Sequence, residues 1–159
     1  MMQNQDVLKI IDGLSNKLLD TEFGDYREEG DLVAEVGELV RDFIGVELGE
    51  FGAVWIRGKD KGKIISAWAY GADFWPDIAV EVRGVPTVAI TVRLAKRDDD
   101  LTEALAPAVG SAVIHSVQYS YAIPFVLDRT DSDPRQHWLD SEIEERLWGD
   151  HRISLVVRQ

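Results

Sequence analysis

The hydrophobic pattern is clearest in the middle of the chain, where two segments alternate polar and apolar residues. Residues 77–82 and 88–94 each place their apolar side chains on one face, as half-buried strands do. A turn separates the two segments, so the pattern predicts a β-hairpin. The two apolar faces coincide only if the connection has an odd length, most simply Gly84-Val85-Pro86. This register sets Asp77 opposite Arg93 and Ala79 opposite Thr91, and it predicts an ion pair between Asp77 and Arg93.

Apolar residues at helical spacing predict two helices before the hairpin, over residues 6–19 and from Asp31 to about Ile44. The acidic, glycine-containing segment between them is expected to be a loop. Two strands are predicted over residues 51–57 and 63–70, joined by a turn whose composition is Gly58-Lys59-Asp60-Lys61-Gly62.

After the hairpin, the pattern returns to helical spacing. Asp100 is a predicted N-cap for a helix from Leu101 to about Ser120, in which Pro107 allows either a kink or a later start. Pro124 places the next predicted strand, residues 121–127, at a sheet edge or a bulge. The remaining predicted elements are a polar loop over 129–136, a helix over 138–148 and a strand over 153–157.

The composition narrows the class of protein. A chain of 159 residues suits one domain, and it contains no cysteine, so disulfides and thiolate chemistry are excluded. Its apolar runs all fall short of the roughly 18 residues that a membrane span needs. The first residues carry neither a basic nor an apolar targeting segment. We therefore expect a cytoplasmic protein that makes no membrane contact.

The net charge of −12 argues against a protein that coats nucleic acid. The charge is uneven, however, because residues 51–97 carry eight basic and four acidic side chains. This segment contains the hairpin, and nucleic acid or another anionic ligand could bind near it. A basic protein partner and a homo-oligomer also stay open.

The order helix, strand, strand, strand, helix, strand over residues 31–128 resembles the core of the PD-(D/E)xK nuclease superfamily, the restriction-endonuclease-like fold. The local pattern is similar as well: Trp75-Pro76-Asp77 begins a strand, an apolar strand follows, and Leu101-Thr102-Glu103-Ala104-Leu105 opens a helix. The resemblance implies an α/β (α+β) domain over residues 1–159, with an αβββαβ core and a central mixed sheet flanked by helices. The helix over 6–19 and the helix and strand over 137–158 would be additions to that core.

The family resemblance also implies metal-dependent phosphodiester cleavage. In the family, the Asp of the Pro-Asp pair and an acid two residues before a Lys hold Mg²⁺. Asp77 matches this pattern, but Thr91 stands at the position of the acid and Arg93 at that of the Lys. Thr91 is neutral and binds Mg²⁺ weakly, and Arg93 stays protonated and cannot act as a base. The predicted catalytic positions Asp77, Thr91 and Arg93 therefore form a degenerate motif.

Two other acids could complete a metal site if the protein were active. Glu81 shares a strand face with Asp77, but it lies four residues away, roughly 13 Å at extended rise. Glu35 belongs to the preceding helix, from which some family members contribute an acid. The candidate metal ligands of an active protein are therefore Asp77, Glu35 and Glu81, although Glu81 is too far along the strand to chelate one ion together with Asp77.

The helix after the hairpin offers no replacement for these acids. Some relatives carry a Gln and a Tyr there, four residues apart, where this chain has Ser111 and His115. We expect His115 to be a packed or surface residue.

Three functions follow from this reading. The first is a binding or structural module on a nuclease-like scaffold that has lost its catalytic metal site and needs no cofactor. The second is an active Mg²⁺-dependent nuclease with a rearranged site. The third is an α/β domain whose acidic surface binds a basic protein.

Overall fold

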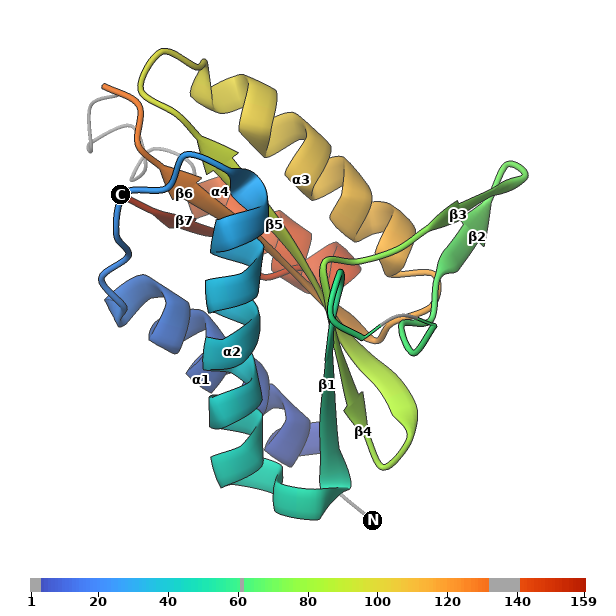
Figure 1. Ribbon diagram of the computed structural model, residues 1–159. Coiled ribbons are helices and arrows are strands. Elements are labelled where there is room, and N and C mark those ends of the chain that lie inside the picture. The colour runs from blue at the N-terminus through green and yellow to red at the C-terminus, as the bar shows by residue number, and fades with distance from the viewer. Residues whose placement is uncertain (1–3, 61, 132–140) are drawn as a thin grey trace.

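The chain folds as a mixed α/β structure, with a sheet of five strands that has helices on both faces (Figure 1). The computed structural model describes residues 4–60, 62–131 and 141–159. Within these residues the helices are α1 (Asn4–Asp20), α2 (Glu29–Leu48), α3 (Leu101–His115) and α4 (Ser141–His151), with a 3-10 turn η1 (Gly49–Phe51). The main sheet contains β1 (Gly52–Ile56), β4 (Ile78–Val82), β5 (Val85–Ala95), β6 (Tyr121–Asp128) and β7 (Val156–Arg158). The predicted α/β class, with a central mixed sheet flanked by helices, is confirmed.

The strands of this sheet lie in the order β1-β4-β5-β6-β7. β1 pairs with β4, and β4 with β5, in antiparallel fashion, whereas the β5–β6 and β6–β7 pairs are parallel. β5 is an 11-residue strand at the centre of the sheet and is buried over most of its length. Its apolar sequence fits a strand that is covered on both faces.

The two faces of the sheet differ in the size of their side chains. The predicted apolar face of the hairpin packs with α1 and α2 in one large core, which includes Ile78, Val80, Val88, Ile90 and Val92. The opposite face carries small residues, and α3 packs there through alanines of its own: Ala95 meets Ala108, and Ala122 meets Ala112. The short side chains allow α3 to lie close to the sheet.

The hairpin register differs from the predicted one by two residues. Ile78 pairs with Ile90, and extending this register by one residue sets Asp77 opposite Thr91 instead of Arg93. The connection is a two-residue turn, Arg83-Gly84, whose φ angles are 53° and 77°. Such turns match the twist of the paired strands. A two-residue turn alone would put the two apolar faces on opposite sides of the sheet. One extra residue in β5, a bulge at Thr87, brings them to the same side: residues 80 and 81 of β4 pair with residues 88 and 86 of β5.

The strand predicted over residues 63–70 does not join β1. A shorter strand, β2 (Ala67–Ala69), pairs instead with β3 (Ala72–Phe74) across Tyr70-Gly71, forming a separate two-stranded hairpin (Figure 1). Tyr70 and Gly71 both have positive φ, 51° and 77°, which suits a two-residue turn. The chain after β1 is held by Asp60, whose carboxylate accepts the Ile56 N–H at 2.9 Å.

β6 is a fully buried inner strand in continuous register with β5, so the prediction that Pro124 places it at an edge or a bulge is wrong. The Ala122 N–H donates to the Arg152 carbonyl on the β7 side, and the nitrogen two residues later faces the same way. On that side, pairing is interrupted between the bridge at Ile153 and the start of β7 at Val156. Pro124, which has no N–H, therefore lies where β6 has no backbone hydrogen bonds to make with β7.

α3 begins as predicted and continues past Pro107. The Asp100 side chain accepts the Thr102 N–H at 3.0 Å, which confirms the N-cap. The helix ends at His115, five residues before the predicted end, and Tyr119 then packs against Ala79 and Ala89 of the sheet. The Tyr119 hydroxyl donates to the Ile65 carbonyl at 2.6 Å and so fixes the segment that precedes β2.

The C-terminal elements extend the main sheet. Most of the polar loop predicted over 129–136, and the start of the helix predicted at 138, lie outside the described residues. α4 runs to His151, and Trp148 stacks on Tyr121 at the start of β6, with 5.9 Å between ring centroids. No helix in the described part of the chain is long and apolar enough to cross a membrane.

Candidate functional site

Asp77 lies just before β4 and is tied to both neighbouring strands. Its backbone carbonyl accepts the Arg57 N–H at 2.8 Å, and its own N–H donates to the Ile90 carbonyl at 3.1 Å. Its carboxylate accepts the Val92 N–H at 2.8 Å. β4 begins only at Ile78, so it has no backbone carbonyl to accept the Val92 N–H of β5. The Asp77 carboxylate accepts it instead.

Glu29, the first residue of α2, likewise accepts a backbone N–H of β5, two residues further along the strand. One carboxylate oxygen accepts the Leu94 N–H at 3.0 Å, and the other accepts a hydrogen bond from the Arg93 guanidinium, also at 3.0 Å. The N–H groups of Val92 and Leu94 point toward the β4 side, beyond the point where β4 can pair with them. Two carboxylates from distant parts of the chain therefore satisfy this edge of β5.

The predicted ion pair between Asp77 and Arg93 is wrong. The two-residue shift of register moves Arg93 away from the position opposite Asp77, and its guanidinium pairs with Glu29. Both partners are half-exposed, at 32% and 40% of their side-chain surface, so the pair itself contributes little stability. The hydrogen bond from Glu29 to the backbone matters more, because it satisfies a strand N–H.

The electrostatics of Asp77 combine opposing effects. Burial raises the pKa of its carboxyl, and the negative charge of Glu29 acts in the same direction. The hydrogen bond from Val92 and the positive charges of Arg93 and Arg57 lower that pKa again. Burial outweighs the backbone N–H and the two guanidinium groups, so the pKa of the half-buried Asp77 carboxyl is raised on balance.

His115 closes the same site from the end of α3. It is buried, at 3% exposure, and its Nδ1 lies 3.5 Å from the Thr91 hydroxyl. Burial, aided by the charge of Arg93, lowers the pKa of His115 from 6.5 to about 4, although a hydrogen bond to the Trp75 backbone opposes the shift. The ring is neutral near pH 7, so it packs and forms hydrogen bonds without carrying charge. The expectation of a packed histidine is confirmed.

The other predicted acids do not reach this place. Glu35 is exposed on the outer side of α2. Glu81 lies opposite Ala53 on β1, and its charge helps burial to raise the pKa of Tyr119 to about 12. The structure therefore sets Asp77 opposite Thr91, with Arg93 further along β5, and leaves Glu35 and Glu81 apart from them.

Sequence reasoning missed Glu29, Arg57 and the packing of His115 against Thr91. Glu29 is hard to find because α2 begins two residues before the predicted start. The residues around it are also acidic, so the sequence does not single out Glu29 among them. The useful signal is its place in the first turn of a helix, where carboxylates are favoured.

The assembled residues do not fit a divalent metal ion. Mg²⁺ binds carboxylates that can give it oxygen ligands in near-octahedral geometry. Here Asp77 and Glu29 already accept backbone N–H groups, and a cation beside them would also face the Arg93 and Arg57 guanidinium groups. No group of three or more His, Asp or Glu side chains that could hold a metal occurs among the described residues.

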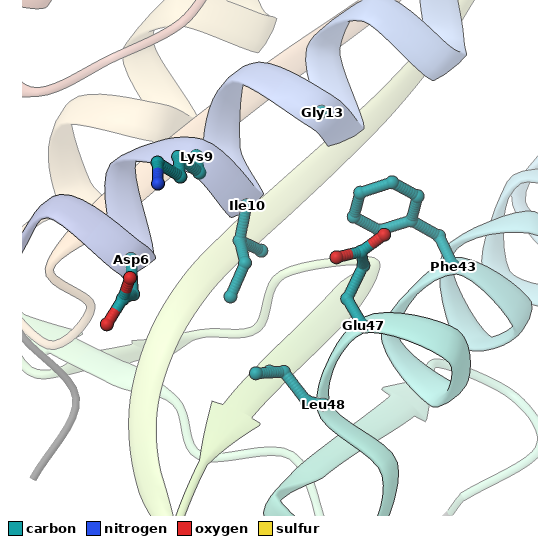
Figure 2. Close-up of a pocket in the computed structure, with 7 residues that line it drawn as sticks. All are labelled: Asp6, Lys9, Ile10, Gly13, Phe43, Glu47 and Leu48. Carbon is teal, nitrogen blue, oxygen red and sulfur yellow. The ribbon is translucent and has the colours of Figure 1, made fainter.

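A separate hollow of about 420 Å³ lies between α1 and α2 (Figure 2). Asp6, Lys9 and Ile10 come to it from α1, and Glu47 and Leu48 from the end of α2. Its lining mixes apolar side chains with both acidic and basic ones. It therefore offers no cluster of like-charged groups that would select a charged ligand. The residues that line this hollow include none of those that contact Asp77.

Comparison with known proteins adds no assignment. The chain matches no protein-family model, no curated protein and no solved structure.

Proposed function

We propose that this protein is a binding module on a scaffold like that of the PD-(D/E)xK superfamily, and that it does not cleave phosphodiesters with a divalent metal. The observation that supports this most strongly is the use of both nearby carboxylates, Asp77 and Glu29, as acceptors for the β5 edge. Both Glu29 oxygens and one Asp77 oxygen accept hydrogen bonds in this way, and a single remaining carboxylate oxygen is a poor holder of Mg²⁺.

The surrounding residues support the same proposal. Thr91 is buried at 3% exposure and lies against His115, so it has neither the charge nor the access of a catalytic acid. Arg93 stabilises negative charge but stays protonated, so it cannot activate a water molecule. Its guanidinium is already engaged with Glu29. The two carboxylates and the two guanidinium groups of Arg93 and Arg57 balance in charge, so this cluster supports the fold of the scaffold and leaves ligand binding to another surface.

A cleavage assay tests the proposal. Dialysed protein should leave plasmid DNA and single-stranded DNA intact with Mg²⁺ or Mn²⁺, at the background level of an Asp77→Ala variant purified in parallel. Cleavage by the wild-type protein that disappears in Asp77→Ala would show that the site is an active nuclease. Equal cleavage by both preparations would identify a contaminant and leave no activity for the chain.

A further inference from the structure

A basic hollow of about 600 Å³ lies where the parallel strands β5 and β6 end. It is lined by Asp25, Tyr26, Arg27, Leu94, Lys96, Arg97 and Arg129. Lys96 and Arg97 directly follow β5, Arg129 directly follows β6, and residues 25–27 lead into α2. Ligands of open α/β sheets commonly bind outside the carboxyl ends of strands, because the loops that follow adjacent strands meet there.

Arg129 is held firmly in the wall of this hollow. Its backbone N–H donates to the Ala95 carbonyl at 2.8 Å, which joins the ends of the two strands. One terminal nitrogen of its guanidinium donates to the Phe23 and Gly24 carbonyls, at 2.6 and 3.3 Å. The guanidinium is therefore preorganised by the protein before any ligand arrives.

Two residues that line the hollow each carry a buried polar atom without a partner. Among the described residues, the buried side-chain atoms without a hydrogen bond are the Tyr26 hydroxyl and Arg129 Nε, and both residues line the basic hollow. A buried donor left unpaired costs about 1–3 kcal/mol, and more when it is charged. Such groups need an explanation, and a bound ion or water is one. Both atoms carry a hydrogen to donate, so what they share is a need for an acceptor.

The lining of the hollow is net positive, although the whole protein has a net charge of −12. The lining has four basic side chains and one acidic one. The Arg97 guanidinium pairs with Asp131 at 3.5 Å, but both side chains are about 80% exposed, so the pair is weak and easily exchanged. The Lys96 and Arg27 side chains are exposed at the rim and can turn toward a ligand.

From these observations we infer that the basic hollow binds the phosphate group of a small phosphorylated molecule. A phosphate monoester offers several acceptor oxygens and up to two negative charges, which match the fixed Arg129 guanidinium and several mobile cations. The hollow is larger than a phosphate ion requires, which leaves room for the organic part of the ligand. The inference rests on the proposed function in that it names what the module binds.

A small molecule fits the surroundings better than a nucleic acid. Residues 1–50, which supply one wall of the hollow, carry 13 acidic and 4 basic side chains. A long polyanion would pass close to these acids and be repelled, whereas one phosphate group can enter the positive hollow alone.

Calorimetric titration of the full chain with phenyl phosphate, at fixed ionic strength, tests the inference. Wild-type protein should bind it, and Tyr26→Phe should weaken binding by about tenfold, because one hydrogen bond to a charged group is lost while the ring still packs. Lys96→Gln should weaken binding as well, and the remaining affinity should depend less on salt. The exposed Lys17→Gln on α1 and Tyr70→Phe on the β2–β3 hairpin are matched controls that should bind as wild type does.

Further arms distinguish the possible ligands. Inorganic phosphate should bind more weakly than phenyl phosphate, and equal affinity would overturn the assignment to an organic phosphate. A 5′-phosphorylated oligonucleotide that bound more tightly than phenyl phosphate would overturn the choice of a small molecule. The site itself would be refuted by the absence of binding up to about 10 mM, or by equal binding in wild type, Tyr26→Phe and Lys96→Gln. None of these results depends on the cleavage assay, so the failure of one proposal is distinguishable from that of the other.

Discussion

The burial of His115 predicts a specific loss of stability in mild acid. Its pKa is lowered from 6.5 to about 4 in the folded protein, so the unfolded chain takes up the proton first as the pH falls. Stability from this group is therefore complete above pH 6.5 and declines as the pH falls toward 4. The full difference corresponds to about 3 kcal/mol, of which about 2 kcal/mol is lost between pH 7.5 and pH 5.

Urea unfolding of wild type and His115→Gln at pH 7.5 and pH 5 measures this term. The variant should lose about 2 kcal/mol less than wild type over that interval. Asp77, whose raised pKa acts with the opposite sign, is common to both proteins. His151→Gln at the exposed end of α4 controls for the removal of any histidine and should follow wild type. Equal pH dependence in wild type and His115→Gln would refute the burial argument.

Two further predictions concern packing and the β5 edge. Gly37→Ala should lower the free energy of unfolding by about 1–3 kcal/mol, because its new Cβ would lie 2.6 Å from Ile56 Cδ1. Gly45→Ala, in open space on the same helix, should raise that free energy by up to about 1 kcal/mol. Equal unfolding midpoints of the two variants would contradict this packing. Glu29→Gln should lower the free energy of unfolding by about 1–3 kcal/mol, since it weakens an acceptor for the β5 backbone. Glu28→Gln, at an exposed neighbouring position, is its control. An equal effect of both changes in urea unfolding would refute the role of Glu29 as an acceptor at the edge of β5.

The alternation of residues predicted which side chains share a face, but it could not fix the hairpin register. A shift of two residues leaves every side chain on its face, so the hydrophobic pattern does not detect it. The register follows from Arg83 at positive φ in a two-residue turn and from the bulge at Thr87. A non-glycine residue in that conformation is uncommon, and no local pattern announces it.

The candidate site was predicted in part for the same reason. Asp77, Thr91 and Arg93 lie on one face, as the alternation specifies, but Asp77 lies opposite Thr91 and not opposite Arg93. The partner of Arg93 depends on the register and on Glu29, which lies 64 residues away in sequence. Contacts over such distances depend on how α2 crosses the sheet, which single-sequence patterns do not encode.

Thermal unfolding of wild type and Asp77→Asn, each with and without Mn²⁺, tests most directly the claim that Asp77 has a structural role. An amide at this position can still accept the Val92 N–H and avoids the burial of a charge. The account therefore predicts that Asp77→Asn is at least as stable as wild type near pH 7.5, and that Mn²⁺ changes neither melting temperature. A rise in the wild-type melting temperature with Mn²⁺ that is absent in Asp77→Asn would contradict it, since only a bound metal ion stabilises the folded state in that way.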